Sequence, residues 1–423
     1  MLPQPFLRAR LALLLTAGLL SACETATPPA AGSTATQQTV ASAAPSATPS
    51  ATPSAVATAR PAAKEPDRAI SIGERHTFRS TVLGEDRAYL VYTPQSYKQS
   101  KTTYPVLYLL DGDAHFHHTT GIVRFLSDNG RAAEMIVVGV SNTDRTRDMT
   151  PTPNKDFPNS GGAAKLLTFL KEELRPRVEG AYRAAPYRVL IGHSFGGLFV
   201  INALTTAPDA FNAYVSLSPS LFWDGELMRR QAEELFGKRP DLQSFLYFTL
   251  GKEPGNMMDS NKSFEAMLKA KAPKGLTWSF KLMDRENHST IPHRATYDAL
   301  EALFLGWELP EKVVTLKALQ AHYEGLSKRF SHEVKAPEAV LNAFGYRMMK
   351  DHRDEALAAF QLNVQLYPDS ANVYDSLGEL HEKSGKPDLA RTNYEMAVRK
   401  ATASADPSLP LFKTNLERLS KPK

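Results

Sequence analysis

One serine lies in a sequence that suits a nucleophile. Gly192-His193-Ser194-Phe195-Gly196-Gly197 follows the apolar run 188–191 and leads into a helical stretch at 198–207. Small residues two positions before and after the serine permit a sharp strand-to-helix turn that lifts the hydroxyl out of a sheet. A glycine-rich turn whose serine only caps the helix has similar residues. Because a strand and a helix both lie where nucleophilic catalysis needs them, we predict that Ser194 is a catalytic nucleophile.

A serine nucleophile needs a general base, and His288 is the best placed of the 11 histidines. An imidazole must accept the hydroxyl proton before the serine can attack a carbonyl. His288 lies in the loop between the last predicted strand, 277–282, and a helix predicted at 292–306. His293 is the alternative base, but it falls in the first turn of that helix. We therefore predict that His288 is the base.

A carboxylate should orient the base, and it should lie between the serine and the histidine in chain order. Glu253 meets this condition, because it follows the predicted strand 245–250 in a loop rich in glycine and proline. We predict Glu253 as the third catalytic residue. The alternative carboxylates are Asp259, Asp284 and Glu286.

Backbone amides are the expected donors to an oxyanion. One comes from the residue after the nucleophile and the other from the loop after an early strand. These positions are Phe195 and Asp113, and Gly112 would allow the tight turn that aims the second amide. Asp111-Gly112-Asp113 also fits an ordinary turn, and the two interpretations are compatible.

Three nearby histidines, His115, His117 and His118, could suggest a metal site. Their spacing lacks a carboxylate or cysteine to complete the ligand set, so a place at the site rim or helix start is favoured. We expect neither a metal nor a cofactor.

The strands and helices that must position these residues alternate along the chain from residue 68. Apolar runs separated by amphipathic helical stretches, such as 163–174 and 263–271, predict an α/β fold with a mostly parallel sheet covered on both faces. A first antiparallel pair precedes them at 75–82 and 87–93. The remaining predicted strands are 106–110, 136–140, 188–191, 213–217, 245–250 and 277–282.

Residues 70–307 resemble the α/β-hydrolases of the putative-esterase group, which includes trilactone-siderophore esterases, feruloyl esterases and mycolyltransferase antigens. The residues that carry the resemblance are the 192–197 motif, 104–113, the block Ser218-Pro219-Ser220-Leu221-Phe222-Trp223 and Glu286-Asn287-His288-Ser289. The resemblance implies a serine esterase and does not identify its substrate. It also implies that Arg145 and Trp223 contact substrate, although Arg145 could instead form a surface salt bridge.

The first 22 residues read as a signal peptide, in which Arg8 and Arg10 precede a short apolar stretch. Leu20-Ser21-Ala22-Cys23 resembles the bacterial lipobox, so Cys23 is the expected lipid attachment site, and Glu24 favours the periplasmic side of the outer membrane over inner-membrane retention. Residues 23–67 are mostly Ala, Thr, Pro and Ser, which predicts a disordered tether in the cell envelope.

The chain becomes helix-only after residue 309. Residues 310–423 resemble tetratricopeptide repeats, with 34-residue frames at Pro337 and Ala371 that align Phe360 with Tyr394. Phe344 departs from the pattern, because the second frame has Gly378 at the equivalent position. This region is a candidate contact surface for a protein partner, or a helical cover for the catalytic domain.

The composition excludes nucleic-acid binding, and the motifs leave three classes of function. A formal charge of +5 over 423 residues, without a basic block among aromatics, excludes nucleic-acid binding. We expect a serine carboxylic-ester hydrolase acting on a small-molecule ester, with siderophore-type trilactones first. An acyltransferase of the same fold, or an inert hydrolase fold that serves as a helical scaffold, remains an alternative.

Overall fold

The computed structural model describes residues 70–98 and 100–420. The expected signal peptide, the lipid site Cys23 and the tether 23–67 lie outside these residues. Within the described ranges, no helix combines the length and the apolar character needed to cross a membrane.

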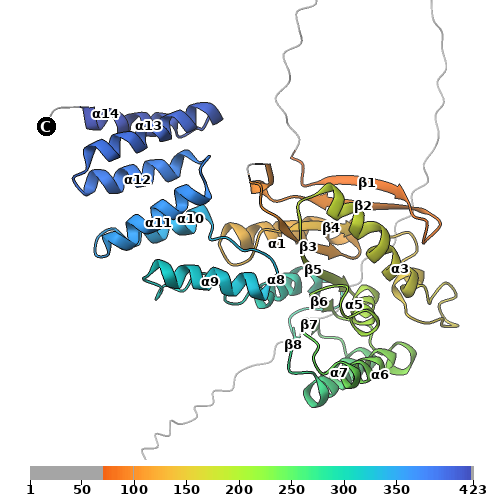
Figure 1. Ribbon diagram of the computed structural model, residues 1–423. Coiled ribbons are helices and arrows are strands. Elements are labelled where there is room, and N and C mark those ends of the chain that lie inside the picture. The colour runs from red at the N-terminus through yellow and green to blue at the C-terminus, as the bar shows by residue number, and fades with distance from the viewer. Residues whose placement is uncertain (1–69, 99, 421–423) are drawn as a thin grey trace, which may run out of the picture. The chain divides into compact units, whose positions relative to one another are not determined.

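Eight strands form a single sheet, in the order β1-β2-β4-β3-β5-β6-β7-β8 (Figure 1). The β1–β2 and β2–β4 pairs are antiparallel, and all the other neighbours are parallel. The expected α/β fold with a mostly parallel sheet is therefore confirmed. The strands are β1 Glu74–Arg79, β2 Asp86–Tyr92, β3 Tyr104–Leu109, β4 Ile136–Val140, β5 Ala184–His193, β6 Ala213–Leu217, β7 Ser244–Leu250 and β8 Leu276–Leu282.

The central strands are apolar throughout because helices cover both faces of the sheet. Every residue of β3, β4 and β6 is buried. Successive residues enter opposite cores: Leu190 of β5 packs in the core under one face, whereas Val189 and Ile191 pack under the other. Full burial of each such side chain contributes about 1.5–3 kcal/mol, so the sheet is a rigid base for the loops at its strand ends.

Helices α3 to α7 supply the apolar side chains on one face of the sheet, and α1 and α8 supply them on the other. Residues 163–174, expected as one helix, form α3 and then the π-helical segment η2. Pro176 has no amide hydrogen to give to residue 172, so regular helical bonding cannot continue there. The elements are η1 Gln95–Lys98, α1 Gly112–Asp128, α2 Arg145–Met149, α3 Ala163–Thr168, η2 Phe169–Leu174, α4 Arg175–Ala181, α5 Phe195–Thr206, α6 Trp223–Lys238, α7 Asn256–Lys271 and α8 Ile291–Leu303.

The chain after residue 310 contains six described helices. Close packing of two helix pairs, α10 with α11 and α12 with α13, depends on one glycine each. A Cβ on Gly345 would lie 2.6 Å from the Phe360 ring, and a Cβ on Gly378 would lie 2.8 Å from the Tyr394 ring. The first frame has Phe344 where a small residue is expected, and Gly345, one position later, takes that role. The helices are α9 Leu316–Arg329, α10 Glu338–Met348, α11 Arg353–Leu366, α12 Ala371–Lys383, α13 Pro387–Ser404 and α14 Leu409–Ser420.

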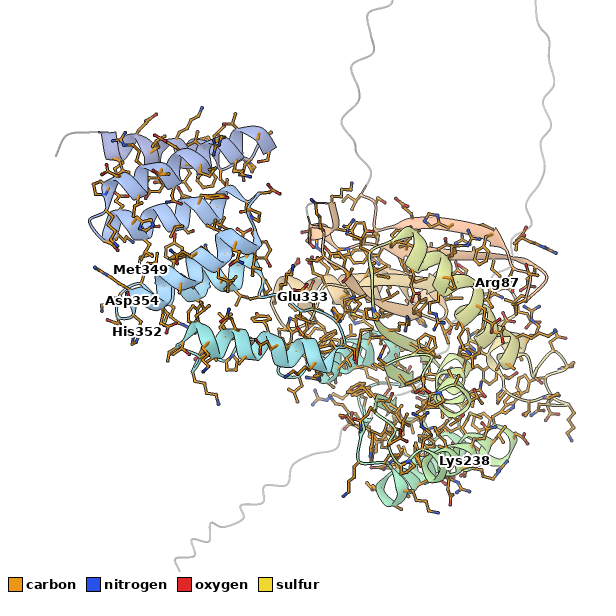
Figure 2. All side chains as sticks on the ribbon, viewed as in Figure 1. Arg87, Lys238, Glu333, Met349, His352 and Asp354 are labelled. Carbon is orange, nitrogen blue, oxygen red and sulfur yellow. The ribbon has the colours of Figure 1, made fainter. Side chains whose placement is uncertain are left out.

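The C-terminal helices share an apolar core with the sheet and with α1 and α8. Phe330, after α9, stacks on Phe304, after α8, with ring centroids 5.1 Å apart, and its edge meets Tyr187 of β5 at 4.9 Å. Both phenylalanines are only 1% exposed. Figure 2 labels Met349, His352 and Asp354 at the turn between α10 and α11. The identification of these helices as tetratricopeptide repeats stays a prediction.

Candidate active site

Ser194 occupies a strained turn between β5 and α5. Its φ and ψ are 60° and −115°, a region that costs about 1–3 kcal/mol for a residue with a side chain. Its amide donates to the Leu217 carbonyl at 2.9 Å, and its carbonyl accepts from the Leu198 amide at 2.9 Å. A Cβ on Gly192 would lie only 2.3 Å from the Gly196 carbonyl oxygen. The glycine spacing is therefore required for the turn to close.

His288 and Glu253 are joined by a short hydrogen bond. The Nδ1 atom of His288 lies 2.5 Å from Oε2 of Glu253. An ionised carboxylate only accepts, so Nδ1 carries the proton and Nε2 remains the free basic nitrogen. The Glu253 side chain is 9% exposed and that of His288 is 41% exposed. The buried Glu253 can thus hold the imidazole ring through Nδ1 while the rest of the ring stays open to a substrate.

Glu253 is held by more than the histidine. Its Oε1 atom accepts hydrogen bonds from Ser218 Oγ at 2.6 Å and from the Gly251 amide at 3.2 Å. Burial acts to raise the pKa of Glu253, but the hydrogen bonds from His288 and Ser218 outweigh it, and the pKa lies below its ordinary value. The carboxylate is therefore ionised at neutral pH, as a residue that stabilises an imidazolium must be.

Of the four candidate carboxylates, Glu253 is the one that binds His288. In the described ranges, Asp259, Asp284 and Glu286 make no side-chain hydrogen bond to His288. His293, the alternative base, lies beside His118, with ring centroids 5.3 Å apart.

His193, the residue before Ser194 in the chain, packs against the ring of His288. The rings of His193 and His288 have centroids 4.6 Å apart. Among residues 70–98 and 100–420, no hydrogen bond joins Ser194 Oγ to the His288 ring. Such bonds are often long in unliganded sites and tighten when substrate binds.

The two expected oxyanion donors lie at helix starts. Phe195 is the first residue of α5, and Asp113 is the second residue of α1. Amides in the first turn of a helix have no intrahelical acceptor, and the helix dipole favours negative charge there. A Cβ on Gly112 would lie 2.6 Å from the Gly139 backbone, which keeps this turn close to β4. The Asp113 carboxylate accepts hydrogen bonds from Arg75 and Ser141, each at 3.0 Å.

The Arg145 guanidinium is bound to protein groups. It donates from Nε to Asp111 Oδ1 at 2.7 Å, and from Nη2 to Asp111 Oδ2 at 3.1 Å and to the His193 carbonyl at 2.8 Å. Its side chain is 33% exposed, whereas that of Asp111 is 6% exposed. The salt bridge that was the alternative to a substrate contact is present, but its partner Asp111 is buried and does not lie on the outer surface.

The expected substrate contact of Trp223 is corrected by its burial. Trp223 is 2% exposed, and its indole Nε1 donates to Thr152 Oγ1 at 3.0 Å. Its ring lies 5.4 Å from those of Phe157 and Phe195. Phe157 is 38% exposed, so Phe157 presents the aromatic surface and Trp223 supports it from below.

Four more imidazoles continue the row that begins at His288, and the last of them, His293, is exposed. His193 is followed by His115 at a centroid distance of 5.9 Å, and His115 Nδ1 lies 3.1 Å from His118 Nε2. His293 then follows His118. Burial, with neighbouring histidines acting in the same direction, lowers the pKa of both His193 and His118 to about 4. These two rings are therefore neutral near pH 7, and they add no positive charge beside Ser194.

No group of three or more His, Cys, Asp or Glu side chains in the described part of the chain is arranged to hold a metal ion. Within the described residues, the Nδ1 atom of His118 and the Nε2 atom of His193 are buried and have no hydrogen-bond partner.

Sequence reasoning gave no role to Ser218, Asp111 or His193. Ser218 and Asp111 both adopt positive φ, 42° and 54°. Each belongs to a segment that carried the family resemblance, but nothing local to those segments indicates that Ser218 binds Glu253 or that Asp111 binds Arg145.

A family model described as "Putative esterase" matches residues 80–288. The ferri-bacillibactin esterase BesA of Bacillus subtilis (strain 168) is 32% identical over 174 residues, 35% of this chain and 59% of that protein. The siderophore enterobactin esterase of Emericella nidulans is 33% identical over 150 residues, 30% of this chain and 49% of that protein. The chain thus spans less than two thirds of either relative.

A solved structure covers more of the chain. The crystal structure of an IroE-like serine hydrolase from Shewanella oneidensis is 30% identical, with a TM-score of 0.62. The match covers 69% of this chain and 99% of that one.

Proposed function

The chain belongs to the putative esterase family of carboxylic-ester hydrolases, and from this premise we propose that it cleaves small esters through an acyl-enzyme on Ser194. The observation that carries the proposal is the 2.5 Å hydrogen bond between His288 and Glu253, beside a serine in a strained strand-to-helix turn. Strained backbone of this kind clusters at active sites, where the surrounding structure holds it in place.

The proposed reaction begins with proton transfer. His288 Nε2 takes the hydroxyl proton of Ser194 as Oγ bonds to the ester carbonyl carbon, and the carbonyl oxygen becomes an oxyanion. The amides of Phe195 and Asp113 stabilise that charge, and Glu253 stabilises the imidazolium. The carbon–oxygen bond to the alcohol then breaks, and His288 returns the proton to the departing alkoxide.

The second half of the reaction releases the acid. Water loses a proton to His288 as it attacks the acyl-enzyme carbonyl, and Ser194 leaves with that proton. An acceptor alcohol in place of water would give acyl transfer.

Siderophore-type esters are the first substrates that we propose. Relatives at 32% and 33% identity are named as esterases of ferri-bacillibactin and enterobactin. The exposed Phe157 ring, which packs on Phe195 next to the nucleophile, supports a planar or aromatic acyl group at this position.

The experiment that tests the catalytic proposal compares the wild type with Ser194→Ala on p-nitrophenyl esters of graded chain length and on a cyclic trilactone siderophore. We expect hydrolysis by the wild type and a loss of about 10³-fold or more in kcat for the variant. Equal rates for the two proteins would contradict the role of Ser194. Product analysis with an added alcohol separates hydrolysis from transfer.

We also propose that Cys23 carries a lipid and that residues 23–67 tether the enzyme in the cell envelope. The support is the lipobox-like sequence that ends at the chain's single cysteine.

A further inference from the structure

One guanidinium connects the two chain segments that carry the oxyanion donors. Arg145 binds both carboxylate oxygens of Asp111, two residues before Asp113, and it binds the carbonyl of His193, two residues before Phe195. These segments follow different strands, β3 and β5. The distance between the two amides therefore depends on the contacts that link the two segments. Arg145 provides such a link, because it binds both of them.

Each of these segments contains a backbone conformation that needs external support. Asp111 lies in the left-handed region, with φ 54° and ψ 43°, and no side-chain hydrogen bond caps the start of α1. Ser194, immediately after the His193 carbonyl, has φ 60°. Non-glycine residues hold such conformations only where surrounding contacts over-determine them, and the bonds from Arg145 are contacts of that kind.

The Asp111 carboxylate is buried against the start of the nucleophile helix. A Cβ on Gly196 would lie 3.2 Å from Asp111 Oδ2, so this oxygen borders the first turn of α5. The carboxylate also accepts from Asn142 Nδ2 at 2.6 Å. A buried carboxylate that loses its cation is left poorly compensated and tends to move. Loss of Arg145 should therefore displace Asp111, and Asp113 with it.

Arg145 is itself held in place by the rest of α2. Asp148 on the same one-turn helix pairs with Arg87 at 2.5 Å, and these side chains are 2% and 1% exposed. Figure 2 labels Arg87, which is on β2. Asp148 also accepts from Arg147 Nε at 2.7 Å. This buried ion-pair network gives the short helix a fixed position from which Arg145 reaches the site.

We propose that Arg145 is a positioning residue that sets the relative placement of the Phe195 and Asp113 amides through its bonds to Asp111 and His193. The inference rests on the proposed esterase function and refines it. In this proposal the guanidinium, two of whose nitrogens are bound to protein, acts on the transition state through the backbone.

The test separates positioning from substrate binding by comparing two esters of similar length. p-Nitrophenyl butyrate has a neutral acyl chain, and mono-4-nitrophenyl succinate has an anionic one. For Arg145→Gln we expect kcat to fall about 10- to 100-fold on both esters, with KM changed by less than about 3-fold. A rise in KM confined to the succinate ester, with kcat unchanged, would show a substrate-binding cation and overturn the proposal.

Arg145→Lys tests the geometry of the side chain. Lysine keeps the charge but cannot bind a carboxylate with two nitrogens and a carbonyl with the same group. We expect it to lose kcat at unchanged KM; wild-type kcat would overturn the proposal. If Arg145→Gln does not melt cooperatively, this variant decides the question.

A double-mutant cycle tests whether Arg145 acts through Asp111. Combining Arg145→Gln with Asp111→Asn should lower kcat no further than the worse single variant, because both changes break one unit. Multiplicative losses would overturn the assignment.

The matched control is Arg188→Gln. Arg188 is on β5 and donates twice to Glu179, at 3.0 and 2.8 Å. We expect wild-type kcat and KM; a loss like that of Arg145→Gln would mean that removing any paired arginine impairs the enzyme and would overturn the specific role. A wild type no faster than Ser194→Ala would instead contradict the esterase function itself.

Discussion

At the scale of single residues, the site depends on which nitrogen of His288 carries a proton. The contact with Glu253 selects the tautomer with hydrogen on Nδ1, and it stabilises the ring when Nε2 becomes protonated. The carboxylate therefore contributes both orientation and charge. Because Glu253 is mostly buried and has two further donors, a replacement of similar shape should keep its place.

Glu253→Gln should lower kcat by about 10²- to 10⁴-fold, with much less effect on KM. An amide group can offer hydrogen to Nδ1, which favours the wrong tautomer, and it carries no charge to balance the imidazolium. Steady-state kinetics on p-nitrophenyl butyrate measure the loss. The corresponding change at one of the alternative carboxylates, Asp284→Asn, is the control and should leave kcat near the wild-type value. Equal losses in the two variants would argue against Glu253 as the orienting acid.

The buried histidines predict a loss of stability in mild acid. The pKa of His118 is about 4 in the folded protein against 6.5 for the free side chain. Between these values the unfolded chain binds a proton that the folded chain does not, so the free energy of unfolding falls as the pH decreases. His193 should act in the same direction.

His118→Asn removes one of these titrating groups. Urea unfolding at several pH values from 7 to 4 should give a pH slope that is smaller than that of the wild type by up to about 1.4 kcal/mol per pH unit. Parallel curves for the two proteins would mean that His118 takes up a proton equally well in both states.

At the scale of secondary-structure elements, α2 shows how a very short helix can be made rigid. Five residues cannot form a stable helix alone, and α2 has an N-cap bond from the Arg147 amide to Asp144 Oδ1 at 2.9 Å and the buried pair of Arg87 with Asp148. The pair is enclosed between β2 and α2, so removing one partner leaves the other charge without compensation.

Asp148→Asn should lower the free energy of unfolding by about 3–5 kcal/mol. Asp86→Asn is the matched control, because Asp86 pairs with Arg79 at 3.6 Å and both side chains are more than half exposed. We expect the control to change stability by less than about 1 kcal/mol. Chemical denaturation of both variants makes the comparison, and a small effect of Asp148→Asn would show that the buried pair is not an anchor.

Much of this level of structure follows from sequence patterns. The apolar runs predict the central strands β3, β4 and β6 because these are buried on both faces, and the expected strand 136–140 matches β4 at both ends. The start of α1 is harder to recognise, since Asp111-Gly112-Asp113 fits a turn as well as a helix start, and α2 is too short to show a period.

Some site residues can be predicted from the local sequence, and some of their contacts cannot. The local motif around Ser194 and the loop position of His288 single out those residues. The hydrogen bonds of Ser218 to Glu253 and of Arg145 to Asp111 join residues 35 and 34 positions apart. They depend on which strands are neighbours in the sheet, and no short pattern contains that information.

At the scale of the whole molecule, the proposed lipid anchor makes a prediction about where the enzyme is found. In a Gram-negative host grown with labelled palmitate, the wild-type protein should carry label and sediment with membranes. Cys23→Ser should carry none and should be recovered in the soluble fraction, because a lipid chain supplies about 0.8 kcal/mol of membrane affinity per buried CH₂ group. Ser194→Ala should retain the label, and labelled Cys23→Ser would contradict the proposed attachment site.

The aromatic contact between the two structural regions has a consequence for how the protein can be divided. Tyr187 and Phe304 belong to the catalytic part, and the ring that covers them, Phe330, comes from the helices that follow. A chain stopped at residue 309 would place both rings in water on a surface that is apolar in the whole protein. Such a fragment should self-associate, because in the whole protein the C-terminal helices cover this apolar surface.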